Sequence, residues 1–172
     1  MIYVLAYPQF EPRLAARLEA FRAVHEPERA QILRPHITLL FGVARAHEAN
    51  IAALFVGLIG VMPSFWITFG TTKVVHDPYD KAFKLFLVCD EGGENVVALH
   101  RHMYDGPHIA ELNPEVPYEP HMTVGASQDE GNLKAARIRD IGPLPIEAVV
   151  RELALVEYSG GKLSTLAVTH LS

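Results

Sequence analysis

The segments Pro35-His36-Ile37-Thr38-Leu39-Leu40-Phe41 and Pro120-His121-Met122-Thr123-Val124-Gly125 share one pattern, and this pattern determines how we interpret the whole chain. Each contains a proline, a histidine, an apolar residue, a threonine and another apolar residue. Side chains of a strand alternate between the two faces of a sheet, so the histidine and the threonine of each segment point the same way. We therefore predict two strands, each with a polar His-x-Thr face opposite an apolar core face.

The spacing of these segments predicts an internal repeat. The two histidines, at positions 36 and 121, lie about half a chain apart. The shift that carries position 36 onto position 121 also carries the predicted helix at 46–59 onto 131–144 and the predicted strand at 64–75 onto 149–160. The sequences of the two halves are hardly alike, so the repeat concerns element order. It predicts two lobes related by a pseudo-twofold axis, each contributing one motif strand to a central cleft.

Hydrophobic periodicity and turn residues outline the other elements. The predicted strands cover 2–7, 36–41, 64–75, 83–89, 119–125, 146–158 and 163–170, with a hairpin at Gly160-Gly161 before the last one. The predicted helices cover 11–23, 46–59, 93–104 and 129–140. This element order predicts an α+β fold and a single two-lobed domain over residues 1–172.

Composition limits the possible classes of function. The chain has a formal net charge of -5 and no basic block, which argues against binding to duplex DNA through phosphate neutralisation. Its longest apolar stretch, Ile51 to Met62, is too short to cross a bilayer, and its N-terminus is interpreted as a strand rather than a signal peptide. The only cysteine, Cys89, is interpreted as a buried core residue, so we expect a cytoplasmic protein. We also expect a monomer.

A pair of imidazoles suits the opening of a cyclic phosphodiester. This reaction needs a base to deprotonate water and an acid to protonate the departing ribose oxygen, and histidines can hold both roles near neutral pH. In-line displacement places the entering and leaving oxygens on opposite sides of phosphorus, so His36 and His121 should flank the phosphate. The hydroxyls of Thr38 and Thr123 can donate hydrogen bonds to its non-bridging oxygens. This arrangement requires no metal and no other cofactor.

Paired strands of this kind, about half a chain apart, resemble those of the 2H phosphoesterase superfamily. That group includes the bacterial 2'-5' RNA ligase and RNA 2',3'-cyclic phosphodiesterase proteins and the plant cyclic phosphodiesterases. The resemblance implies a bilobal 2H phosphoesterase-like fold of two antiparallel-sheet lobes with outer helices and a central cleft. It also implies that His36 and His121 are the acid–base pair and that Thr38 and Thr123 bind the phosphate.

The expected function is hydrolysis of a nucleoside or RNA-terminal 2',3'-cyclic phosphate, with a nucleotide or an RNA terminus as substrate. We prefer His121 as the base that activates water and His36 as the acid, although a nearly symmetric site could reverse the two. Phe41 and Tyr118 could stack on a base or ribose, and packing is at least as common a role for them. The candidate cations for the cleft, which no motif places, are Arg34, Lys73, Lys84 and Lys162.

Three alternative functions remain open. The first is an RNA end-joining ligase that uses the same residues for the reverse chemistry. The second is a non-catalytic nucleotide- or RNA-binding module. The third is a metallohydrolase with the histidines as ligands, although the pattern provides no third ligand or nearby carboxylate.

Overall fold

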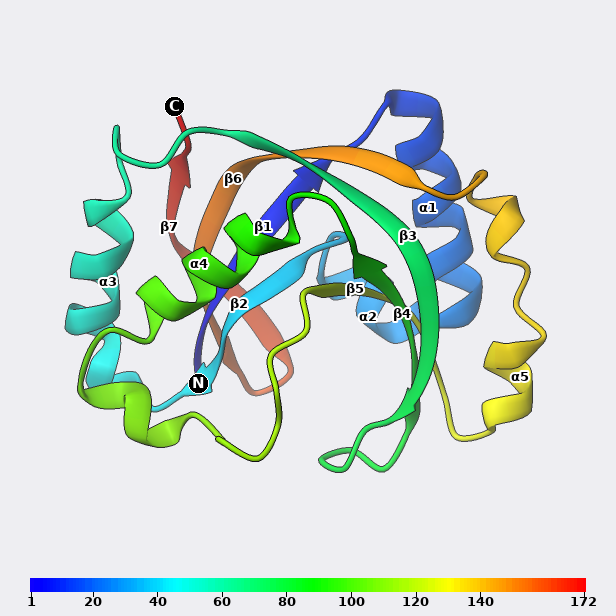
Figure 1. The fold of residues 1–172 in the computed structure, drawn as a ribbon. Coiled ribbons are helices and arrows are strands. Elements are labelled where there is room, and N and C mark those ends of the chain that lie inside the picture. The colour runs from blue at the N-terminus through cyan, green and yellow to red at the C-terminus, as the bar shows by residue number, and fades with distance from the viewer.

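The computed structural model describes all 172 residues and shows a strongly curved antiparallel sheet with helices outside it (Figure 1). The strands are β1 (Ile2–Gln9), β2 (Ile37–Val43), β3 (Phe65–His76), β4 (Phe83–Cys89), β5 (His121–Ser127), β6 (Ile146–Ser159) and β7 (Lys162–His170). The α-helices are α1 (Pro12–His25), α2 (Pro27–Ile32), α3 (Glu48–Gly57), α4 (Gly93–Met103) and α5 (Glu130–Lys134). Short 3₁₀ turns cover Arg45–His47, Pro107–Glu111 and Ile138–Asp140. The predicted α+β class is confirmed.

The sheet places the two motif strands side by side. The strand order is β1-β2-β5-β4-β3-β6-β7, and β1 also pairs with β6, so the pairings of six strands close into a ring. β2 and β5 are antiparallel neighbours in which Ile37 lies opposite Met122. The shift in residue number that carries His36 onto His121 also carries Ile37 onto Met122. A twofold axis that relates the two motifs would place such equivalent residues opposite each other. The predicted pseudo-twofold arrangement is therefore confirmed.

The two halves of the chain share the order β-α-β-α-β, and they exchange their third strands. One lobe contains β2, β1 and most of β6, with β7 added at its edge, whereas the other contains β5, β4 and β3. β3 and β6 pair with each other and join the lobes. Helices α3 and α4 cover the first lobe, while α1 and α5 cover the second (Figure 1).

The main core lies between the sheet and the helices. Ile37 and Leu39 of β2 and Met122 and Val124 of β5 are completely buried there, as the alternation predicted. Burial of a large apolar side chain contributes about 1.5–3 kcal/mol. These residues therefore fix the orientation of the two strands, and with it the direction in which the polar face points.

Two helical segments differ from the prediction. The helix predicted at 129–140 is wrong in extent, because α5 ends at Lys134 and only a 3₁₀ turn follows. Gly131 and Asn132 are poor helix formers, and α5 buries Leu133 alone. Conversely, α2 was not predicted. It buries no side chain and so lacks the apolar periodicity that would reveal it.

No helix in the structure is long and apolar enough to span a membrane. Cys89 is unpaired, and burial raises the pKa of its thiol to about 12. The nucleophilic thiolate is therefore scarcely formed near neutral pH. Cys89 is only partly buried, and it packs against the main core rather than inside it.

Candidate active site

The four motif side chains share the face of the sheet that lies opposite the core. Because β2 and β5 are antiparallel and Ile37 lies opposite Met122, His36 lies opposite Thr123 and Thr38 lies opposite His121. The two histidines therefore occupy diagonal corners of a four-residue group. The side chain of His36 is buried, whereas the other three are partly exposed.

Each histidine is held by the same backbone contact. Nδ1 of His36 lies 2.8 Å from the carbonyl oxygen of Arg34, and Nδ1 of His121 lies 2.7 Å from the carbonyl oxygen of Glu119. A carbonyl oxygen only accepts hydrogen bonds, so both Nδ1 atoms donate. The neutral form of each ring then carries its lone pair on Nε2, which is the atom left for proton transfer.

The electrostatic surroundings of the two rings differ. The pKa of His36 is lowered to about 3, chiefly by burial and also by the positive charges of Arg29 and Arg22, against the opposing effect of the backbone bond. Burial also lowers the pKa of His121, but there the bond to Glu119 and the negative charge of its carboxylate oppose the shift. His121 therefore keeps a proton to higher pH than His36.

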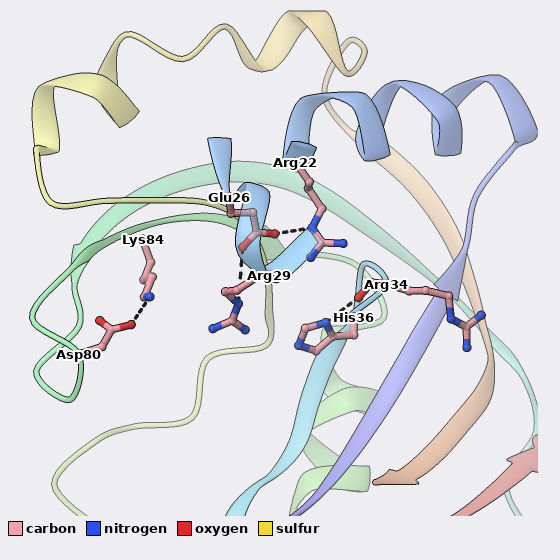
Figure 2. A network of polar contacts seen from close by, with 7 residues as sticks. All are labelled: Arg22, Glu26, Arg29, Arg34, His36, Asp80 and Lys84. Atoms are coloured by element: carbon pink, nitrogen blue, oxygen red, sulfur yellow. Dashed lines mark hydrogen bonds and ion pairs between the residues drawn. The ribbon is translucent and has the colours of Figure 1, made fainter. Parts of the chain in front are cut away.

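The residues at equivalent positions before the two motifs account for part of this difference. Arg34 and Glu119 correspond to each other under the repeat that relates the two histidines, and they have opposite charges. The Arg34 guanidinium bonds to Glu152 at 2.5 Å and lies 4.0 Å from the centroid of the Tyr7 ring. Figure 2 shows that the Arg34 side chain points away from the His36 ring. The carboxylate of Glu119 forms an ion pair with Lys73.

Aromatic rings hold the histidines in place. Phe86 stacks on His121 with 3.6 Å between ring centroids and 19° between ring planes. Tyr7 meets His36 edge-on at 6.5 Å. Sequence reasoning missed both residues, because nothing in their own strands distinguishes them from core aromatics.

Tyr118, Phe41 and Lys162, which the sequence offered as substrate contacts or cleft cations, lie in different surroundings. The hydroxyl of Tyr118 donates to the carbonyl oxygen of Thr38 at 2.9 Å, and its ring stacks on His100 at 3.7 Å. Tyr118 thus supports the backbone of the first motif. Phe41 is 42% exposed and meets Tyr118 edge-on. Lys162 is exposed at the first position of β7, in the hairpin.

A group of ion pairs lies beside His36 (Figure 2). Arg22 of α1 forms an ion pair with the buried Glu26, and Nε of Arg29 in α2 lies 3.6 Å from the same carboxylate. Lys84 of β4 forms an ion pair with Asp80 nearby. The spacings of i, i+4 and i, i+3 could have indicated the first two contacts. They could not show that the α1–α2 corner lies beside His36.

Two surface hollows are lined by neither the histidines nor the threonines of the motifs. One, of about 610 Å³, is lined by Arg101, His102, Tyr104, Asp105, Gly106 and Ile109. The other, of about 400 Å³, is lined by Glu19, Arg22, Ala23, Pro27, Ala30, Gln31, Arg34 and Pro35. No group of three or more His, Cys, Asp or Glu side chains in the structure is arranged to hold a metal ion.

Comparisons with known proteins show the family and the fold of the chain. The family model of the 2'-5' RNA ligase superfamily matches residues 10–162. The structure of Escherichia coli LigT with 3'-AMP has a TM-score of 0.62 to this chain at 17% identity, covering 99% of this chain and 97% of LigT. LigT has also been solved with ATP and with phosphate.

Two further solved structures have the same fold. TT0787 of Thermus thermophilus has a TM-score of 0.60 at 22% identity, covering 98% of this chain and 97% of its own. Usb1 of Kluyveromyces marxianus has a TM-score of 0.59 at 12% identity, covering 96% of both chains. Among curated proteins, the sequence has no match.

Proposed function

The chain belongs to the 2'-5' RNA ligase superfamily, and from this premise we propose that it hydrolyses a nucleoside or RNA-terminal 2',3'-cyclic phosphate without a metal. Members of this superfamily are phosphoesterases and ligases, so the chain is an enzyme of the two-histidine type. The observation that carries the proposal is the diagonal placement of His36 and His121, each opposite the other motif's threonine.

This arrangement suits in-line displacement at phosphorus. One Nε2 takes a proton from water as the water oxygen attacks phosphorus, and the other Nε2 gives its proton to the ribose oxygen as the P–O bond breaks. The hydroxyls of Thr38 and Thr123 donate hydrogen bonds to the non-bridging oxygens, where negative charge accumulates. The bond between Nδ1 and a backbone carbonyl keeps each Nε2 directed at the phosphate.

The electrostatics favour His36 as the base and His121 as the acid, which reverses the preference drawn from the sequence. With a pKa of about 3, His36 is protonated in about one molecule in ten thousand at pH 7. It is therefore a poor proton donor, and it is fully available as an acceptor. His121, beside the Glu119 carboxylate, is the better proton donor.

This assignment predicts the pH profile. Because His121 must be protonated, kcat/KM should fall as the pH rises through a pKa that lies below the ordinary value of 6.5. Replacing Glu119 by Gln removes the charge that raises the pKa of His121, so this alkaline limb should move to lower pH. The measurement is kcat/KM between pH 4 and 9 on a 2',3'-cyclic nucleotide. Glu115→Gln, an exposed change in the same loop, serves as the matched control. A shift of the acidic limb instead would make His121 the base.

The proposed function is tested by turnover of the four 2',3'-cyclic nucleotides in EDTA. We expect that at least one of them is hydrolysed and that its rate is the same with and without EDTA. Loss of activity in EDTA and its recovery with added metal would instead favour a metallohydrolase. Binding without turnover would favour a nucleotide-binding module.

End joining at the same residues is the second candidate, because the matched family is described as one of 2'-5' RNA ligases. An RNA with a 2',3'-cyclic phosphate end and a partner with a 5'-hydroxyl end would distinguish the two reactions. Hydrolysis leaves a phosphomonoester, whereas joining produces a longer strand.

A further inference from the structure

The ion pairs beside His36 come from three parts of the chain and contain more positive than negative charge. The cations are Arg22, Arg29 and Lys84, and the carboxylates are Glu26 and Asp80. Arg22, Glu26 and Lys84 are buried, whereas the Arg29 side chain is 44% exposed. Arg29 is held only through Nε, so the two Nη groups at the end of its guanidinium form no hydrogen bond within the protein.

The strand register locates this group relative to the catalytic residues. Lys84 and Phe86 are two residues apart on β4 and face the same side, and Phe86 stacks on His121. Phe86 pairs with Thr123, which lies opposite His36, whereas Lys84 pairs with Ala126. Lys84 therefore lies on the catalytic face, displaced from the His36–Thr123 end by about 7 Å, two residues at ~3.3 Å each.

The Arg29 side chain lies near both histidines and the Lys84–Asp80 pair. In the view of Figure 2 it lies between Lys84 and His36. The charge of Arg29 lowers the pKa of His36, of His121 and of Asp80. The exposed guanidinium of Arg29 thus lies near the position between the histidines that the proposed function gives to the reacting phosphate.

The buried pair behind Arg29 has no evident role in stability. Burying a charge pair costs about as much in desolvation as it returns, and an apolar pair is often as stable. Nη2 of Arg22 is buried with no acceptor within hydrogen-bond distance, which is a further cost. The pair does fix the Glu26 carboxylate, and its free oxygen Oε2, which makes no hydrogen bond, lies 3.6 Å from Nε of Arg29 and attracts that guanidinium.

We propose that Arg29 binds a second phosphate of the substrate, attached to the 5' oxygen of the nucleotide that carries the cyclic phosphate. A guanidinium fork with free Nη groups matches two phosphate oxygens. The place of Arg29 on the Lys84 side of His36 (Figure 2) suits a phosphate that neighbours the reacting one on the same nucleotide. The inference rests on the proposed function, since it places the reacting phosphate between the histidines. The second phosphate is either a terminal 5'-monoester or an internucleotide diester.

Binding of two unreactive ligands tests the site without relying on catalysis. Wild type should bind adenosine 3',5'-bisphosphate at least about tenfold more tightly than 3'-AMP, since a charge-assisted hydrogen bond contributes enough for one to two powers of ten. In Arg29→Gln this ratio should fall to near one. Arg17→Gln, the same change at an exposed position of α1, should keep the wild-type ratio. Titration calorimetry at low salt is the measurement, because salt screens an exposed charge.

Three outcomes would overturn the inference. The wild type could bind the two ligands equally well, Arg29→Gln could keep the tenfold ratio, or neither ligand could bind. Turnover then identifies the source of the phosphate. kcat/KM is compared for adenosine 2',3'-cyclic phosphate with a 5'-hydroxyl, with a 5'-phosphate, and as the 3' residue of a dinucleotide. If the compound with a 5'-phosphate is the only one with a raised kcat/KM, the second phosphate is a monoester. If the dinucleotide also has a raised kcat/KM, the second phosphate can be a diester. If none is hydrolysed but the binding ratio holds, the proposed function fails and the Arg29 site stands.

Discussion

Alanine at His36 or at His121 should lower kcat for a 2',3'-cyclic nucleotide by at least about a hundredfold, the usual effect of losing a general acid or base. The two histidines act in one proton-transfer sequence, so the double variant should be little worse than either single variant. The measurement is initial rates in EDTA at pH 6. The control is His170→Ala, an exposed histidine at the end of β7.

A structural effect of the same changes can be distinguished from a chemical one. His36 is buried, so His36→Asn is compared with His36→Ala. Asparagine keeps a side-chain donor for the carbonyl oxygen of Arg34 but cannot carry a proton between water and the substrate. We expect the asparagine variant to fold as the wild type does and to be nearly as inactive as the alanine variant. Wild-type activity in the double alanine variant would show that neither histidine is catalytic.

Replacing Glu26 by Leu should lower the free energy of unfolding by about 3–5 kcal/mol, because the Arg22 charge would remain buried without its partner. Urea or thermal denaturation measures this change. The double variant Arg22→Met/Glu26→Leu removes both charges and should recover most of the lost stability.

Glu28→Leu is the matched control for that series. Glu28 is exposed on α2 and forms no ion pair, so its replacement should change the stability by less than about 0.5 kcal/mol. If Glu26→Leu lowered the free energy of unfolding by less than about 1 kcal/mol, the Arg22 charge would not depend on Glu26 as the buried ion pair implies. A double variant as unstable as the single one would show that packing of the side chains, rather than charge, determines the loss.

The strand framework could be predicted because local pattern and tertiary environment agree there. The apolar residues of both motifs alternate with histidine and threonine, and the structure buries Ile37, Leu39, Met122 and Val124 completely. The hairpin at Gly160-Gly161 was equally visible, since both glycines adopt positive φ, at 57° and 77°. The short helix α2 was not visible, because it buries no side chain.

The surroundings of the two histidines could be predicted only in part. The motifs indicate which four side chains share a face, and the antiparallel pairing of β2 with β5 adds which histidine lies opposite which threonine. Of the charges around the two rings, Glu119 lies next to the second motif, whereas Arg22 and Arg29 lie elsewhere in the sequence. Arg29 acts on His36 across the α1–α2 corner, and neither the spacing nor the residue types show how that corner packs. The sequence therefore could not show which charges surround each ring, and for this reason it favoured His121 as the base.

The pairing of β1 with β6 also has a consequence for biosynthesis. Ile2 lies opposite Glu157, so β1 cannot gain this neighbour until the ribosome has made the chain as far as β6, long after it has made β2. Such distant contacts make folding slow, and apolar residues of β1 such as Val4 and Ala6 remain exposed in the meantime. Until β6 has been made, β1 can pair with β2 alone, and its other edge stays open, which is a condition in which chaperones bind and aggregation begins.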